Sequence, residues 1–302
     1  MAQATRELKR RIKGIASTKK VTKAMELVAA SKMRRAVQAA VATRDYSLRA
    51  WELLTNLAEV TDANLHPLLT RRTVKRGLLI VFTSDRGLAG GLNTQVIRQA
   101  LEAAKGFGPA PYDVITVGQK GQDALVRSGL SLVATFKNPA RQPTLADILP
   151  IARIAIDGYI KGQYDRVLIV ATDYLSPISQ KPNQRAVLPI SRQDLRASIE
   201  AIGSRANGQK QPTEFELTEY LFEPTADEVL EAMLVRLVEV QLYQAMLEAT
   251  ASEHASRMVA MRNATDAATD LIDELTLDFN KARQAGITQD LAEISASRAA
   301  LE

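Results

Sequence analysis

The sequence predicts an α/β fold in which a Rossmann-like α/β domain is inserted between two long helices that pair as an antiparallel coiled coil. Three observations predict it. Apolar residues recur every three or four positions through the last quarter of the chain, no proline occurs before Pro67, and between these ends short strands alternate with helices. We place the N-terminal helix within residues 1–65, the α/β domain within 66–224 and the C-terminal helix within 225–302.

The N-terminal segment is predicted to form one helix over about residues 5–63, because helix formers dominate it and the first proline follows a few residues later. Alanine fills many of the inward positions of this helix, and such small residues let a second helix approach closely. The apolar face is carried by residues at helical spacing: Leu8, Ile12, Ile15, Met25, Val28 and Met33.

The central segment alternates between strand and helix patterns, which indicates a mainly parallel Rossmann-like sheet. Strands are predicted at residues 77–83, 112–117, 130–136 and 166–171, with further extended pieces at 185–190 and 215–222. Helices are predicted from the end of a glycine-rich turn at 84–93 to about residue 105, and at 119–127 and 144–160.

The C-terminal segment is predicted to form a rod. It opens with a capping-box pattern at Thr225–Glu228, directly after Pro224. Its 225–302 length corresponds to about 115 Å of helix, whereas a compact globule of this size is roughly 50 Å across, so the rod needs a partner. Counting by heptads gives one seam along this helix, and it is apolar except at Gln244, His254 and Thr265. Its positions are Leu230, Met233, Leu237, Val240, Gln244, Leu247, Ala251, His254, Met258, Met261, Thr265, Ala268, Ile272, Leu275, Phe279 and Ala282.

Charge is distributed unevenly along the chain. Residues 1–76 carry 17 Lys and Arg against 6 Asp and Glu, whereas residues 225–302 carry 6 against 14, so the two ends should attract each other. The basic face of the first helix suits an acidic partner, either nucleic acid or acidic protein loops. Without interleaved aromatic residues for base stacking, a protein partner is favoured. The face consists of Arg6, Lys9, Arg10, Lys13, Lys19, Lys20 and Lys23.

Candidate catalytic chemistry is sparse. Gly87, Gly90 and Gly91 lie between a strand and a helix, but their spacing matches neither the dinucleotide-binding nor the P-loop pattern, so a tight turn needing positive φ is the favoured interpretation. His254 lies in the seam, where a polar residue more often fixes register, and His66 lies in a loop. We expect no enzymatic activity, no cofactor and no metal site in this chain.

The composition also bounds the setting of the protein. The absence of cysteine excludes disulfides and thiol chemistry and suggests a reducing compartment. No stretch of eighteen apolar residues is present, so we expect no direct insertion into a membrane.

Several segments resemble the gamma-subunit family of the F-type ATP synthases, whose members form a central rotor shaft. These are TKKVTKAMELVAASKMRRA at 18–36, TSDRGLAGGLN at 83–93 and the run from 251 to 294 that contains NKARQAGIT. The similarity spans the whole chain in the same order. Ala89 stands where many members of the family have cysteine.

The resemblance implies a non-catalytic shaft. The coiled coil would stand inside a ring of alpha and beta subunits, with the α/β domain near the epsilon subunit and the membrane c-ring. Proton flow would turn the c-ring and the shaft, which drives the catalytic beta subunits through their conformational cycle for ATP synthesis. The complex would lie peripherally on the cytoplasmic face of the energy-coupling membrane, with no nucleic acid involved.

The resemblance also assigns contact residues by motif. Beta-subunit contacts are implied for Lys23 and Met25 in KAMELVAASK and for Arg283, Gln284 and Thr288 in NKARQAGIT. An apolar bearing at the helix tip is implied for Leu291 and Ile294. A foot on the c-ring and epsilon subunit is implied for Tyr220, Phe222 and Glu223 in EYLFEP.

Two other functions fit part of the pattern. The basic N-terminal region also suits a nucleic-acid-binding coiled-coil scaffold, which would show affinity that falls steeply with salt. The turn at Gly87–Gly91 also suits a nucleotide-binding enzyme, for which the isolated chain would retain nucleotide in equilibrium dialysis.

Overall fold

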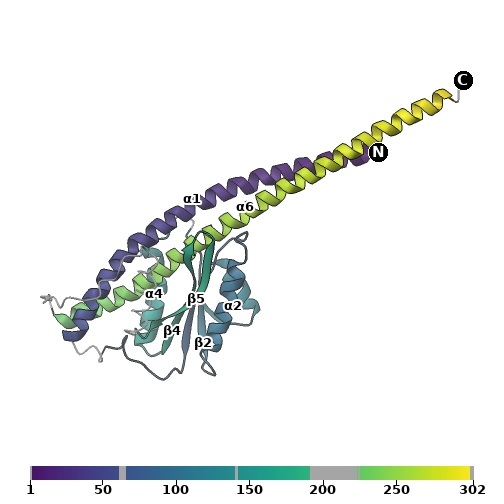
Figure 1. Cartoon of the computed structure of the whole chain (residues 1–302). Helices are drawn as coiled ribbons and strands as arrows, with labels where there is room; N and C mark the ends of the chain where they lie inside the picture. The colour runs from purple at the N-terminus through teal and green to yellow at the C-terminus, as the bar shows by residue number, and fades with distance from the viewer. Residues whose placement is uncertain (1, 61–65, 140–141, 191–222, 224, 300–302) are drawn as a thin grey trace. The chain divides into compact units, whose positions relative to one another are not determined.

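A computed structural model describes residues 2–60, 66–139, 142–190, 223 and 225–299 (Figure 1). The extended piece expected at 215–222 lies outside the described residues. The elements, in chain order, are α1 (Ala2–Val60), β1 (Gly77–Phe82), α2 (Leu92–Lys105), β2 (Tyr112–Val117), α3 (Gln119–Arg127), β3 (Leu132–Phe136), α4 (Leu145–Ile160), β4 (Arg166–Ser176), β5 (Ser179–Leu188) and α6 (Ala226–Ala299). The predicted plan of a terminal helix, an α/β region and a second terminal helix is confirmed.

The five strands form one sheet in the order β3-β2-β1-β4-β5. The first four are parallel, with Ile80 of β1 opposite Ile115 of β2 and Ile169 of β4. β5 runs antiparallel to β4 at the edge. The prediction of a mainly parallel, Rossmann-like sheet is therefore confirmed.

The last two strands differ from the expected ones. β4 continues to Ser176 and turns back through Pro177 into β5, so they form a hairpin. The sequence pattern showed only the apolar parts of each strand, at 166–171 and 185–190. The intervening residues mix polar and apolar types without a regular alternation, and most of those from Leu175 onward are exposed. Pro182 is tolerated because β5 lies at an edge.

Helices cover both faces of the sheet, and the buried strand β1 feeds two cores. Leu78, Ile80 and Phe82 point into a core shared with α4 and the first half of α6. Leu79 and Val81 point the other way, into a core shared with α2. Figure 1 shows α2 separated by the sheet from α4. The alternation follows from the period of two in a strand that is buried on both faces.

By its contacts the chain divides into two units, one made of residues 1–30 and 257–302 and the other of residues 31–256. Both long helices therefore contribute to both units. In the larger unit, α6 is built into the sheet core through apolar residues at helical spacing: Leu230, Leu234, Leu237, Val238, Leu242, Ala245 and Met246.

The inward face of α1 differs in part from the predicted one. Met33 is buried, as expected, but Val28 is 57% exposed. Its neighbour Ala29 is buried instead, followed by Ala36 and Ala40. The row of buried small residues fits the close helix approach that the alanine content predicts.

The seam predicted along α6 is the inward row of the helix. Each of its sixteen positions, from Leu230 to Ala282, is buried or half-buried. In the smaller unit, α1 contacts this row at Thr265. The hydroxyl oxygens of Thr22 on α1 and Thr265 on α6 lie 2.8 Å apart, and both side chains are buried.

Candidate functional site

The carboxyl ends of β1 and β4 mark the position where Rossmann-like folds bind ligands. From β1 the chain crosses through α2 to β2 on one side, whereas β4 lies on the other side of β1 and is reached from β3 through α4. The strand order thus reverses between β1 and β4, and the crevice outside such a reversal is the usual ligand site of an open parallel sheet.

The glycine-rich turn that follows β1 is fixed by short hydrogen bonds. The Ser84 hydroxyl donates to the Arg86 carbonyl at 2.7 Å, and the Ser84 amide donates to Asn93 Oδ1 at 3.0 Å. Positive φ is confirmed at Gly90, at 56°, but not at Gly87 or Gly91; Leu88 adopts it instead, at 62°. The chain therefore turns tightly from β1 into α2.

The protein's own helix α6 lies against this crevice. The Ser256 hydroxyl donates to the carbonyl of Ala89 in the glycine-rich turn at 2.9 Å, and the Ser252 hydroxyl donates to the carbonyl of Thr172 in β4 at 3.2 Å. Ala89 and Ser252 are buried. Where other sheets of this type hold a ligand, this one holds a helix.

These two serines belong to a row of polar side chains on α6, which we call the polar row: Gln244, Glu248, Ser252 and Ser256. Glu248 contacts Arg185 of β5 at 3.2 Å, so the row hydrogen-bonds to β5, to β4 and to the glycine-rich turn. Burial alone would lower the pKa of the Arg185 guanidinium, but the charges of Glu248 and Asp173 raise it. Arg185 is therefore held as a cation between two carboxylates.

Sequence reasoning missed most of the polar row. It noted Gln244 as an exception in the seam but did not single out the three residues that follow. The sequence did contain a signal for the polar row: positions 244, 248, 252 and 256 are all polar, and their spacing of four places them on one face of the helix.

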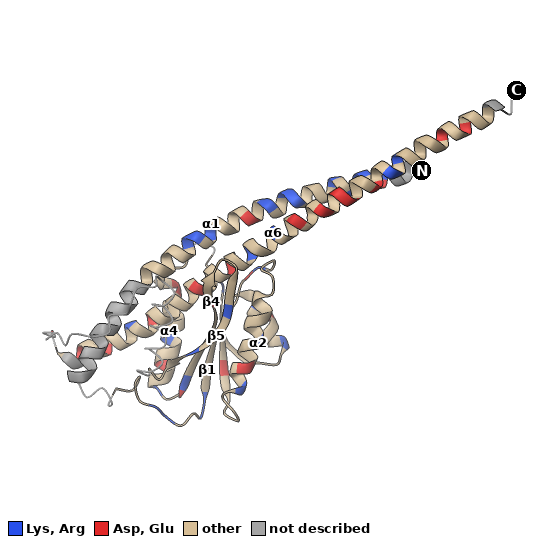
Figure 2. Ribbon diagram, in the orientation of Figure 1, with Lys and Arg blue, Asp and Glu red and all other residues tan. Residues whose placement is uncertain are grey.

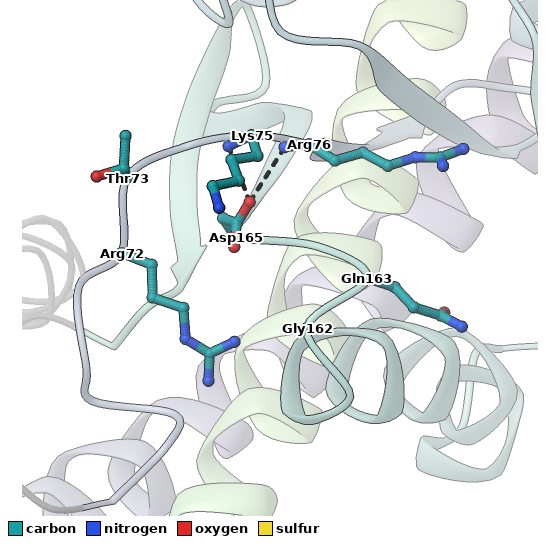
Figure 3. A pocket seen from close by; sticks show the side chains of 7 residues that line it. All are labelled: Arg72, Thr73, Lys75, Arg76, Gly162, Gln163 and Asp165. Atoms are coloured by element: carbon teal, nitrogen blue, oxygen red, sulfur yellow. Dashed lines mark hydrogen bonds between the residues drawn. The ribbon is translucent and has the colours of Figure 1, made fainter.

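A second feature is a cavity of about 560 Å³ at the opposite edge of the sheet, before β1 and β4 (Figure 3). Arg72 lies over the Tyr159 ring, 5.1 Å from its centre, and donates to the Tyr159 carbonyl at 3.2 Å. Asp165 accepts from the Lys75 and Arg76 amides. The lining is Arg72, Thr73, Lys75, Arg76, Gly162, Gln163 and Asp165.

The charged groups around this cavity hold the segment that enters β1. In Figure 3, Arg76 extends to the opposite side of the view from Arg72, and its guanidinium pairs with Asp113 at 2.9 Å. Asp113 also accepts from the Tyr164 hydroxyl at 3.0 Å, and burial together with this bond raises the pKa of Tyr164 to about 12. These contacts tie Arg72 to α4, and residues 75 and 76 to β2 and to the residue that precedes β4.

The contact residues expected on α1 lie in the smaller unit. Lys23 is exposed and pairs with Glu26 at 2.9 Å, while Met25 is half-buried. In Figure 2 the ribbon of this part of α1 is marked by the blue of Lys and Arg, and that of the later part of α6 by the red of Asp and Glu, in line with the predicted charge asymmetry.

The contact residues expected near the end of α6 are all exposed. Arg283 and Gln284 point to solvent, and the Thr288 hydroxyl donates to the Gln284 carbonyl at 3.0 Å. Leu291 and Ile294 are 60% and 66% exposed. Arg283 lies eighteen residues beyond Thr265, the partner of Thr22, which is about 27 Å along the helix. The two predicted contact regions are therefore separate.

The expected foot is described only at Glu223, which is exposed. Tyr220 and Phe222 lie outside the described residues. Among the residues that the structure describes, no group of three or more His, Asp and Glu is placed to hold a metal ion. The described helices also include none with the length and apolar character needed to cross a membrane.

Long helices at both ends of the sequence and a central, mainly parallel sheet whose carboxyl edge contacts one of them define a class of α/β protein in which a terminal helix is hydrogen-bonded to the sheet. A family model described as ATP synthase matches residues 4–301. The chain is 41% identical to the ATP synthase gamma chain of Roseiflexus castenholzii, over 99% of this chain and 98% of that one, and 42% identical to that of Herpetosiphon aurantiacus, over 100% and 99%. The protein belongs to the ATP synthase gamma-chain family.

Solved structures share the fold. A chain of the Euglena gracilis mitochondrial ATP synthase, from an assembly of OSCP, F1 and c-ring, aligns with a TM-score of 0.65 at 20% identity, covering 100% of this chain and 95% of that one. A chain of the Tetrahymena thermophila mitochondrial central stalk and c-ring aligns with a TM-score of 0.58 at 24% identity, covering 81% and 99%.

Proposed function

We propose that this protein is the central rotor shaft of a proton-translocating F-type ATP synthase and is not catalytic by itself. It couples rotation of the membrane c-ring to the conformational cycle of the catalytic beta subunits, and it thereby also regulates ATP hydrolysis and proton flow. Its partners are an alpha–beta ring, an epsilon subunit and the c-ring. The complex lies peripherally on the cytoplasmic face of the energy-coupling membrane. The whole-length match to gamma chains supports this function.

The observation that carries the proposal is the end of α6. The inward row remains half-buried as far as Gly286, whereas residues 287–297 are all exposed although the helix continues to Ala299. Three apolar residues, Ile287, Leu291 and Ile294, recur along this exposed end at helical spacing. An exposed apolar stripe favours a partner, and a socket in which the tip turns fits it.

The paired helices supply the stiffness that a shaft needs. We infer that α1 and α6 form an antiparallel coiled coil, which is supported by the half-buried heptad row of α6 and by the Thr22–Thr265 contact. Lys23 and Met25 on one helix and Arg283, Gln284 and Thr288 on the other then face the beta subunits. Glu223, with Tyr220 and Phe222, belongs to the foot.

A non-catalytic role is supported by the crevice of the sheet. The hydrogen bonds from Ser252 and Ser256 seat α6 where a Rossmann-like enzyme would bind a nucleotide. Coupling in such a protein is mechanical: a stiff element biases partners that have discrete conformational states.

Reconstitution tests the function. The purified chain is expected to show no ATPase activity alone and to form a stoichiometric, ATP-hydrolysing complex with alpha and beta subunits from a relative such as Roseiflexus castenholzii. Addition of the membrane sector in vesicles should then give ATP-driven proton pumping. Failure of the chain to enter the complex, while the native gamma chain does so, would rule the function out.

A further inference from the structure

A buried cluster of three charges joins three elements of the larger unit. Arg185 of β5 forms ion pairs with Asp173 of β4 and with Glu248 of α6. The side chains of Asp173 and Glu248 are only 6% and 1% exposed, and that of Arg185 is 22% exposed. We call these three residues the ionic joint. Here a charged group of the sheet contacts a charged group of α6.

Neighbouring amides fix the orientation of both carboxylates. Asn183 donates to Asp173 Oδ2 at 3.0 Å, and Gln244 donates to Glu248 Oε1 at 3.1 Å. Gln244 Oε1 is itself buried without a hydrogen-bond partner. An unsatisfied buried acceptor costs stability, so this arrangement favours one geometry for Glu248 at the expense of the Gln244 oxygen.

The ionic joint differs physically from the apolar packing that surrounds it. The contacts that Leu234, Val238 and Leu242 of α6 make with the sheet core are non-directional, so they press α6 onto the sheet without selecting one partner for each side chain. A slide of α6 by one turn, about 5.4 Å, would instead place Gln244 or Ser252 opposite Arg185. Glu248 would then be buried without its cationic partner, whereas Arg185 and Asp173 would stay paired on the sheet, and a buried carboxylate that loses its partner is strongly unfavourable.

We propose that Arg185 is a positioning residue that fixes the axial and rotational register of α6 on the sheet, so that torque applied to the α/β region passes into the helix without slip. The inference deepens the proposed rotor function, and its claim that torque is transmitted rests on that function. The register itself is a property of the isolated chain.

The first test measures the register in the purified full chain. The sequence has no cysteine, so cysteines introduced at the exposed positions Gln184 of β5 and Ala232 of α6 can be spin-labelled specifically. The distance distribution between the labels is measured with the joint intact and in Asp173→Leu/Arg185→Met/Glu248→Leu. This triple variant replaces the charges by apolar groups of similar size, a change that often preserves stability. We expect one narrow label-to-label distance when the ionic joint is intact and a broad or bimodal distribution in the triple variant.

Two further variants keep the test decisive. Arg185→Lys retains the charge but loses the planar fork that reaches two carboxylates, so we expect intermediate broadening even if the triple variant unfolds. Arg98→Met/Glu102→Leu removes an exposed ion pair on α2 and should leave the distance unchanged. A distance that stays narrow in a folded triple variant, or in Arg185→Lys if the triple variant unfolds, would overturn the proposal.

The second test measures coupling in the reconstituted complex. The ratio of proton pumping to ATP hydrolysis is expected to fall roughly twofold or more in the triple variant, within the range that mutations along a coupling network produce, while the chain keeps its unfolding temperature. A purely structural joint would lower the unfolding temperature and leave the ratio intact, which would refute the torque role. If the wild-type chain does not assemble, the rotor function fails, yet the distance measurement still decides the register.

Discussion

Thr22 Oγ1 lies 2.8 Å from Thr265 Oγ1, so two buried hydroxyls 243 residues apart in sequence form a hydrogen bond between the first and last helices. Each hydroxyl also reaches a carbonyl of its own helix, Lys19 for Thr22 and Met261 for Thr265. Since each hydroxyl has one proton, one of them donates across the helix pair while the other donates within its own helix. This contact fixes the register of α1 on α6 in the smaller unit.

We expect Thr22→Val and Thr265→Val each to destabilise the helix pair by about 1 kcal/mol, because each removes the hydrogen bond across the pair and leaves the other hydroxyl with only the carbonyl of its own helix. The double variant should cost less than the sum of the two, since no hydroxyl remains to be satisfied. Hydrogen-exchange protection of residues 16–30 and 257–272 measures the effect locally. Additive losses in the double variant would contradict the contact.

A second prediction concerns Gly118, at the end of β2. Its φ is 102°, and a Cβ atom added there would lie 2.3 Å from the Thr83 carbonyl oxygen. Backbone strain and overlap together should make Gly118→Ala cost about 3 kcal/mol or more. Gly87→Ala is the matched control, because a Cβ at Gly87 meets no atom within 4 Å and its φ is not positive. Thermal unfolding of the two variants should differ clearly; equal unfolding temperatures would argue against this geometry.

A third prediction concerns pH. Burial lowers the pKa of His66 from its usual 6.5, although the charge of Glu231 acts in the opposite direction. The neutral ring accepts a hydrogen bond at Nδ1 from the Leu68 amide at 3.2 Å. The unfolded chain therefore binds the proton more readily than the folded one, and this contribution to stability is present above about pH 6.5 and is lost as the pH falls through the lowered pKa.

We expect the unfolding temperature of wild type to decline more steeply than that of His66→Asn between about pH 7 and pH 5. Asparagine can keep an acceptor near the Leu68 amide without titrating. Parallel curves for the two proteins over this range would show that His66 does not titrate in the way expected.

The fourth prediction tests the proposed beta-subunit contacts. Arg283→Ala/Gln284→Ala should weaken torque transmission, seen as less proton pumping per ATP hydrolysed by the reconstituted complex. Both side chains are exposed on α6, so the free energy of unfolding should change by no more than about 0.5 kcal/mol. Arg98→Ala/Glu102→Ala, an exposed ion pair on α2, is the control. Loss of helicity in the first variant, or equal pumping defects in both, would count against the assignment.

Val28 and Ala29 show where the sequence predicts the inward face of α1 and where it does not. Helical periodicity and hydropathy favoured Val28 as an inward residue, but the structure buries Ala29 and exposes Val28. The predicted row passed through the polar stretch 16–22, where hydropathy gives no phase. The buried row runs through Thr22, a polar residue that periodicity based on apolar side chains cannot select, because its burial depends on a partner hydroxyl on another helix.

The glycine-rich turn shows the same division. Its position between β1 and α2 and its lack of a nucleotide-binding pattern were readable from local spacing. That the Ala89 carbonyl accepts a hydrogen bond from Ser256 depends on where α6 lies. The same holds for Arg185, whose two carboxylate partners are on β4 and α6.

The sequence by itself determined the elements of this protein, their order, the parallel core strands, the heptad row of α6 and the family, because these follow from local periodicity, turn residues and long motifs. Only the tertiary structure decided which side chains meet: that β4 and β5 form a hairpin, that the polar row seats α6 at the crevice of the sheet, and that Thr22 finds Thr265. Burial of polar groups depends on partners distant in sequence, and no local pattern encodes those partners.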